Sequence, residues 1–198
     1  METVELTAKA GADWIGFVFF PKSVRAVDAH AATGLLPYCG DAEPVALLVD
    51  ADDRLIDEVL ATGISVLQLH GKETPDRVAQ IKARTGAEIW KAVGVSTGAD
   101  LVTLHHYDAA DRWLLDAKPP EGSEVPGGHG AVFDWSILSG WQAQRPWLLS
   151  GGLDDSNVSY AISETGAAAV DVSSGVEASR GLKDAALIEA FIKAAKAA

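Results

Sequence analysis

The sequence predicts an α/β fold in which short strands form a parallel sheet and helices connect them. Seven short runs are almost continuously apolar, which suits strands that are buried on both faces of a sheet. They cover residues 14–19, 44–49, 64–69, 87–93, 113–115, 146–149 and 167–172. Between them lie amphipathic stretches with helical spacing, among them residues 52–61, 75–84, 156–164 and 184–195.

Helix boundaries agree with this alternation. Thr74 precedes Pro75, the combination of a cap and a first-turn proline that begins helices. Residues 154–156 are acidic or capping residues, so we expect another helix to start there. Four glycines, each just before a predicted strand, suit left-handed helix caps: Gly11, Gly63, Gly86 and Gly166. Their spacing fits multiples of a unit of about 26 residues.

The alternation leaves two architectures open, a doubly wound open sheet and a closed (β/α) barrel. Eight units of about 26 residues would make roughly 208 residues, near the 198 of this chain. A barrel needs eight strands, whereas we count seven and about eight helices, and the chain opens on a helical stretch at residues 2–10. A barrel would therefore lack its first strand. No linker or change of composition divides residues 1–198, so we expect one domain.

Composition and charge exclude several classes of protein. With 48% apolar and 22% charged residues, the chain is neither disordered nor fibrous. A net charge of −12 disfavours nucleic acids and anionic membranes as partners. We see no signal peptide and no apolar run of about 18 residues that would span a membrane. The single cysteine, Cys39, cannot form an internal disulfide, which indicates a cytoplasmic protein.

Two glycine- and serine-rich turns follow consecutive predicted strands. Gly151 and Gly152 follow the run at 146–149, and Ser173 and Ser174 follow the run at 167–172. Such turns expose backbone N–H groups and hydroxyls, the groups that bind phosphate after the last strands of a barrel. The alternative is that they are only tight turns. Two of them on adjacent strands favour a phosphate site.

Charged residues follow two other predicted strands. Asp116 ends the run at 113–115, where partial desolvation would favour a protonated carboxyl and general-acid chemistry. A helix cap or an ion pair with Lys118 is the alternative. Lys22 and Arg25 follow the run at 14–19 and suit an anionic ligand, with Arg25 able to bind a carboxylate through two hydrogen bonds. A solvated turn explains them equally well.

The remaining candidates are weaker. His70 ends the run at 64–69 and would either contact a ligand or fix the loop that follows. The other histidines, at 30, 105, 106 and 129, show no metal-ligand spacing. Cys39 precedes a predicted strand, at the end opposite to the other candidates, so we expect a structural thiol. The long irregular segment at 117–131 has a length that usually indicates function.

Taken together, these motifs resemble the phosphoribosylanthranilate isomerases, (β/α)8-barrel enzymes of tryptophan biosynthesis. The resemblance covers nearly the whole chain. It is carried by residues 16–19 with Ser23 and Arg25, 67–71, 91–93, 114–116, 127–130 with 133–135, 149–153 and 170–177. Each motif is weak by itself, but their order and spacing are specific.

The resemblance implies an Amadori rearrangement of N-(5′-phosphoribosyl)anthranilate, without metal or organic cofactor, by a monomer or homodimer. A general acid opens the ribose ring to a Schiff base, and a general base then removes the C2′ proton. Asp116 matches the acid, and Arg25 matches the contact to the anthranilate carboxylate. His70, Gly128 and Asp171 match other substrate contacts. The phosphate site matches Gly151, Gly152, Ser173 and Ser174.

The sequence departs from the family pattern at its beginning. The family starts with a strand that reads Lys-Ile-Cys-Gly and carries the general-base cysteine, whereas residues 1–6 here correspond to the following helix. We therefore expect a barrel without its first strand, with poor activity for the chain as written. The recorded start could lie too far downstream. Two alternatives are a non-catalytic phosphosugar-binding barrel and a fragment completed by another polypeptide or a second copy.

Overall fold

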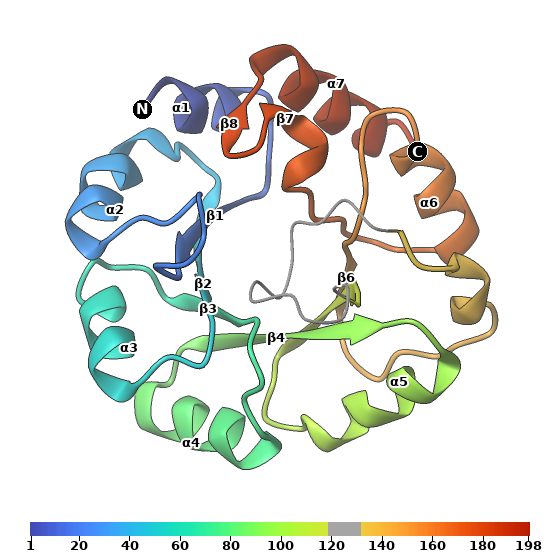
Figure 1. The fold of residues 1–198 in the computed structure, drawn as a ribbon, viewed down its shortest axis with the longest axis horizontal. Coiled ribbons are helices and arrows are strands. Elements are labelled where there is room, and N and C mark those ends of the chain that lie inside the picture. Colours follow the sequence, from blue (N-terminus) through green and yellow to red (C-terminus); the bar gives the residue numbers. More distant parts are fainter. Residues whose placement is uncertain (119–131) are drawn as a thin grey trace.

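Helices and strands alternate along the chain, and the helices surround the strands (Figure 1). The computed structural model describes residues 1–118 and 132–198. Its α-helices are α1 (Glu2–Lys9), α2 (Ala29–Leu35), α3 (Asp53–Leu60), α4 (Pro75–Thr85), α5 (Gly98–Thr103), α6 (Val158–Thr165) and α7 (Ala185–Lys196). Its 3-10 helices are η1 (Leu36–Tyr38), η2 (Leu104–His106), η3 (Trp135–Leu138) and η4 (Ser174–Val176).

Six strands form one parallel sheet, in the order in which they occur in the chain. They are β1 (Trp14–Phe19), β2 (Glu43–Leu48), β3 (Val66–Leu69), β4 (Glu88–Val95), β5 (Arg112–Ala117) and β6 (Trp147–Leu149). Because the order never reverses, the doubly wound alternative is excluded. The strands instead curve into a half-barrel inside the ring of helices (Figure 1). All six carboxyl ends therefore lie at one end of the molecule.

The predicted barrel of seven strands with a missing first strand is wrong for the described residues. The run at 167–172 forms only an isolated bridge, in which Val170 lies beside Leu149. Its partner strand β6 ends early, because Gly151 and Gly152 take left-handed φ angles of 92° and 63°. Two short strands that were not predicted, β7 (Glu177–Ser179) and β8 (Leu182–Lys183), form a separate antiparallel hairpin.

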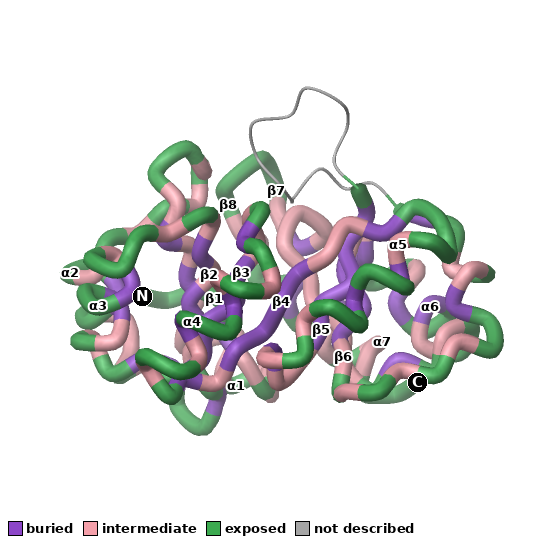
Figure 2. Tube along the Cα trace, turned by 90° about the horizontal axis from the view of Figure 1, so that it is seen from below, coloured by how far each residue is buried: buried purple, intermediate pink, exposed green. Residues whose placement is uncertain are grey.

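Apolar side chains are buried on both faces of the sheet, as the continuous runs predict. All four residues of β3 are buried, as are five of the six in β5. Inside the half-barrel, Val45, Val66, Trp90 and Leu114 form one cluster, while a larger cluster lies between strands and helices. Figure 2 shows the buried residues concentrated along the strands. This packing fixes the strand ends, and with them the side chains that follow.

The helix boundaries largely follow the sequence signals. Thr74 Oγ1 accepts a hydrogen bond from Arg77 N at 3.2 Å, and Gly86 and Gly166 cap α4 and α6 with φ angles of 67°. The helix expected at residues 154–156 starts only at Val158, because these residues form a turn before it. Among the described residues, no helix is both long and apolar enough to cross a membrane.

Candidate active site

Acidic, imidazole and hydroxyl side chains meet at the carboxyl ends of the parallel strands. His70 directly follows β3, Asp116 lies near the end of β5, and Ser150 directly follows β6. Asp171 N donates a hydrogen bond to Leu149 O at 2.8 Å, which places Asp171 beside the end of β6. Folds built from parallel strands and connecting helices form their ligand sites at this end.

Asp116 forms a hydrogen-bonded pair with His70. Asp116 Oδ2 lies 3.2 Å from His70 Nε2, and His70 Nδ1 lies 3.0 Å from Gln68 Oε1. The imidazole of His70 therefore lies between Gln68 and Asp116, and contacts through both ring nitrogens orient the ring towards the carboxyl group. Lys118, the alternative partner of Asp116, pairs instead with Asp100 at 2.6 Å.

The first glycine-rich turn packs directly against Asp116. A Cβ atom at Gly151 would lie 2.6 Å from Ala117 N and 3.0 Å from Asp116 Oδ1. The positive φ of 92° at Gly151 also disfavours any side chain. Glycine therefore allows the turn after β6 and the carboxyl group at the end of β5 to share one surface.

Asp171 is a second carboxyl group at this surface, and it is half-buried. It accepts a hydrogen bond from Ser150 Oγ at 2.9 Å. Burial is the main cause that raises the pKa of Asp171 above its ordinary 3.8; the Ser150 hydrogen bond opposes this rise. The charge of Asp116 raises the pKa further, whereas His70 and Lys183 lower it. The net upward shift means that Asp171 keeps its proton to a higher pH than an exposed aspartate does.

The second turn, around Ser173 and Ser174, touches the first. A Cβ atom at Gly175 would overlap Leu153 O, so only glycine allows this close approach. Ser174 begins the short 3-10 helix η4. The two turns that the sequence places after consecutive strands are therefore in contact, next to Asp116 and Asp171.

Arg25 reaches the same end of the molecule from the loop after β1. Its Nε and Nη2 atoms donate to the two carboxylate oxygens of Glu177, at 2.6 and 2.7 Å. Burial alone would raise the pKa of Glu177, but hydrogen bonds from Arg25, Gly181 N and Lys183 outweigh it and lower the pKa from 4.5 to about 2. Glu177 is therefore ionised at neutral pH, in a pair with a fixed geometry.

Lys183 is a site cation that the sequence analysis missed. Its Nζ lies 3.1 Å from Glu177 Oε1 and donates to Ser173 O at 2.7 Å. Glu177 lies in the motif at residues 170–177, but the family resemblance implies no role for it. Nothing in the sequence marks Lys183, because the β7–β8 hairpin that carries it has no apolar pattern of its own.

A buried ion pair fixes the loop that carries His70. Lys91 Nζ lies 2.7 Å from Glu73 Oε2 and also donates to Leu69 O and Gly71 O, at 3.1 and 2.8 Å. Both side chains of the pair are only 2% exposed. The motif at 91–93 is part of the resemblance, but its lysine was not expected to act on the site. The pair holds the backbone on both sides of His70.

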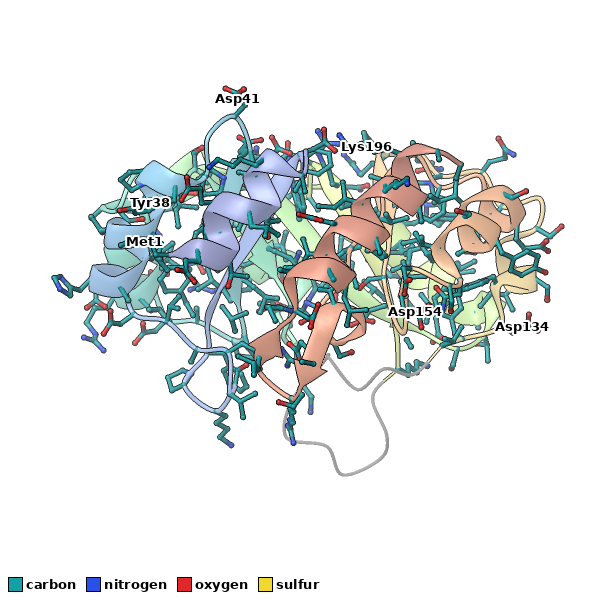
Figure 3. All side chains as sticks on the ribbon, turned by 90° about the horizontal axis from the view of Figure 1, so that it is seen from above. Met1, Tyr38, Asp41, Asp134, Asp154 and Lys196 are labelled. Atoms are coloured by element: carbon teal, nitrogen blue, oxygen red, sulfur yellow. The ribbon has the colours of Figure 1, made fainter. Side chains whose placement is uncertain are left out.

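The other candidates do not join this cluster. Cys39 is buried and precedes β2, and burial raises the pKa of its thiol, which disfavours a nucleophilic role. Asp41, two residues later, lies at the end of the molecule opposite to the β7–β8 hairpin (Figure 3). Gly128 and His129, with most of the segment at 117–131, lie outside the described residues. Within those residues, no group of three or more His, Cys, Asp and Glu side chains could hold a metal ion.

A family model, several sequence relatives and several solved structures point to the same family. A family model described as N-(5′-phosphoribosyl)anthranilate (PRA) isomerase matches residues 1–194. The isomerase of this name from Hyphomonas neptunium is 57% identical over 196 residues, which cover 99% of this chain and 92% of the relative. The crystal structure of phosphoribosyl anthranilate isomerase from Thermotoga maritima is 36% identical, with a TM-score of 0.88, and the match covers 100% of this chain and 94% of that one.

A further crystal structure is of the isomerase in complex with reduced 1-(o-carboxyphenylamino)-1-deoxyribulose 5-phosphate. It is 34% identical, with a TM-score of 0.85, over 100% of this chain and 94% of that one. These matches give no sign of a missing first strand or of a missing catalytic residue. The expectations of a shortened barrel and of a non-catalytic relative find no support in them. On the family model and the identity of these relatives, the chain belongs to the N-(5′-phosphoribosyl)anthranilate isomerase family, the isomerases of tryptophan biosynthesis.

Proposed function

We propose that this chain converts N-(5′-phosphoribosyl)anthranilate to 1-(2-carboxyphenylamino)-1-deoxyribulose 5-phosphate by an Amadori rearrangement. The observation that carries the proposal is the packing of the Gly151 turn against Asp116, with Asp116 in turn bonded to His70 at 3.2 Å. Asp116, as a proton donor, and the Gly151 turn, which suits a sugar phosphate, can then contact the same bound ligand. Family membership supports the same reaction.

Asp116 acts as the general acid. Its carboxyl group protonates the ring oxygen of the ribose, the ring opens, and the nitrogen of the anthranilate forms a Schiff base with C1′. His70, whose Nε2 lies 3.2 Å from Asp116 Oδ2, stabilises the carboxylate that remains after the transfer by a hydrogen bond. A base then removes the C2′ proton to give an enolamine, and this becomes the ketone when C1′ takes up a proton and the C2′ hydroxyl group loses one. Cys39 takes no part in this step, because it precedes the amino end of β2 and the site lies at the carboxyl ends of the strands.

The substrate is held at three places. The backbone N–H groups of the turns at Gly151, Gly152, Ser173 and Ser174 bind the phosphate. Arg25 binds the carboxylate of the anthranilate ring, and Asp171 accepts hydrogen bonds from the sugar hydroxyls. We propose no metal or organic cofactor for this reaction, and we expect the protein to act in the cytoplasm on a small molecule.

Turnover and binding of one variant test the proposal. Asp116→Asn keeps the shape of the side chain but cannot supply the proton, so turnover should fall by about 100-fold or more. Calorimetry with reduced 1-(o-carboxyphenylamino)-1-deoxyribulose 5-phosphate, the reduced product analogue, should show that this variant still binds the analogue. Binding by the wild-type protein without any turnover would support the non-catalytic alternative. A wild-type protein that neither binds the analogue nor turns over substrate would overturn the proposal.

A further inference from the structure

Glu177 occupies only one edge of the Arg25 guanidinium group. The Nε and Nη2 atoms along one edge donate to Glu177, and the two side chains are only 13% and 3% exposed. A guanidinium group has a second edge, formed by its two terminal nitrogens, which can bind another carboxylate through two parallel hydrogen bonds. The buried pair therefore fixes the direction in which that second edge points.

The same carboxylate also holds Lys183 and the hairpin that carries it. Glu177 Oε2 accepts from Gly181 N at 3.0 Å, and Glu177 Oε1 lies 3.1 Å from Lys183 Nζ. A Cβ atom at Gly181 would lie 3.2 Å from Val24 Cγ2, so the hairpin also packs against the loop that carries Arg25. One buried carboxylate thus joins two cations from distant parts of the chain.

Lys183 connects this cluster to the second turn, the one at Ser173 and Ser174. Its Nζ donates to Ser173 O at 2.7 Å, while Ser173 Oγ lies at 3.5 Å. An ammonium group at this position fixes the Ser173 backbone and adds positive charge beside the turn. Arg25 and Lys183 therefore stand at two places of the site where an anionic ligand could be bound.

We infer that Glu177 is a positioning residue that makes the site selective for a ligand with two anionic groups, a carboxylate at Arg25 and a phosphate at the turn braced by Lys183. The inference rests on the proposed function, which places the phosphate at that turn. Glu177 itself is negative and would repel both groups of the ligand. Its contribution to binding is therefore geometric, because it holds two cations at a set separation.

The direction in which one substitution changes ligand affinity shows whether Glu177 acts through its geometry or through its charge. Glu177→Gln removes a negative charge from the site, so charge alone would tighten the binding of an anionic ligand. If Glu177 acts by positioning, affinity for the reduced product analogue instead falls, by about tenfold or more. An analogue whose aromatic ring lacks the carboxylate should lose less affinity, because it does not use Arg25.

Calorimetry with both analogues provides the test, and Glu88→Gln is the matched control. Glu88 also pairs with an arginine, Arg112, at 2.8 Å, but it lies at the amino end of β4, away from the site. The control should bind both analogues as the wild-type protein does. The inference would be overturned if Glu177→Gln bound the reduced product analogue, which carries the carboxylate, as tightly as the wild-type protein does or more tightly. Failure of the wild-type protein to bind that analogue would instead count against the proposed function.

A second variant keeps the test open if Glu177→Gln does not fold. Arg25→Lys retains the positive charge but cannot form two parallel hydrogen bonds with Glu177 and two more with a ligand. It should weaken binding of the carboxylate analogue and leave binding of the carboxylate-free analogue nearly unchanged. Equal weakening of both analogues would contradict the assignment of Arg25 to the carboxylate.

Discussion

Asp171 shows how the protonation of one half-buried side chain affects the stability of the fold. Its pKa is raised in the folded protein, chiefly by burial, so the folded state binds its proton more tightly than the unfolded chain does. The stability that this group contributes is complete below the ordinary carboxyl pKa. It is lost as the pH rises through the raised folded pKa.

Replacement of Asp171 by asparagine should remove this dependence on pH. We expect the stability of Asp171→Asn, relative to the wild-type protein, to increase as the pH rises from about 3.5 towards 7. Urea unfolding of both proteins over this range measures the difference, and effects of the other carboxylates cancel. A difference that stays constant with pH would show that the pKa of Asp171 is not raised.

Gly151 is a residue at which any side chain would disturb the site. Gly151→Ala would place a Cβ atom 2.6 Å from the backbone nitrogen of Ala117, at a φ of 92°. We expect the free energy of unfolding to fall by about 2 to 4 kcal/mol and turnover to fall as Asp116 is displaced. Urea unfolding and kinetics check both effects.

Gly166→Ala is the control for this substitution. Gly166 also has a left-handed φ, of 67°, but no heavy atom lies within 4 Å of the position of its missing Cβ. The Gly166→Ala variant should lose only about 1 kcal/mol in its free energy of unfolding and should keep the turnover of the wild-type protein. Similar losses of activity in the two variants would contradict the role of close packing against Asp116.

At the scale of elements, the loop between β3 and α4 depends on the buried pair of Lys91 and Glu73. Glu73 Oε1 also accepts from Asp50 N at 2.9 Å, so the carboxylate links this loop to the end of β2 as well. Lys91→Met would leave a buried carboxylate without its cation, which typically lowers stability by about 3 to 5 kcal/mol. Urea unfolding measures the loss.

A second substitution separates the loss of the pair from the burial of a lone charge. Adding Glu73→Gln to Lys91→Met removes the unpaired charge, so the double variant should be more stable than Lys91→Met alone. A double variant less stable than either single variant would contradict this account. For comparison, removal of the exposed pair of Arg54 and Glu58 should leave stability almost unchanged.

The sequence predicted elements best where burial set the pattern. The runs that became β1 to β6 are apolar because both of their faces are covered, and Thr74 and Gly86 mark the ends of α4 through local backbone chemistry. The run at 167–172 is equally apolar, yet its neighbour β6 is only three residues long and cannot pair with more of it. Whether a run forms a strand depends on the length of the neighbouring strand, which the apolar pattern of the run itself does not indicate.

The site was predictable where it follows strand ends. Asp116 and the turn at Gly151 come directly after buried runs, and parallel strands bring such positions together. The roles of Glu177 and Lys183 depend instead on the β7–β8 hairpin, whose residues are mostly exposed or half-buried. Gly181, with a φ of 87°, is the one local signal of that turn. The partner of Arg25 could therefore not be read from the sequence.

At the scale of the whole molecule, the net charge of −12 acts against an anionic ligand. Long-range repulsion by exposed acids is screened by salt over about 10 Å at 0.1 M, whereas half-buried cations such as Arg25 are screened less. The KM for the substrate should therefore fall as potassium chloride is raised from about 10 to 150 mM. Steady-state kinetics measures this, and a KM that rises from the lowest salt would show that local attraction dominates.

The pair of Arg25 and Glu177 joins residues that are 152 positions apart in the chain. During synthesis, a ribosome therefore releases the loop after β1 long before its partner exists. Six strands can already associate while the guanidinium group still faces water. Ligand recognition is completed only when the β7–β8 hairpin emerges, so a nascent chain halted before the hairpin would leave Arg25 without Glu177 and bind its substrate poorly.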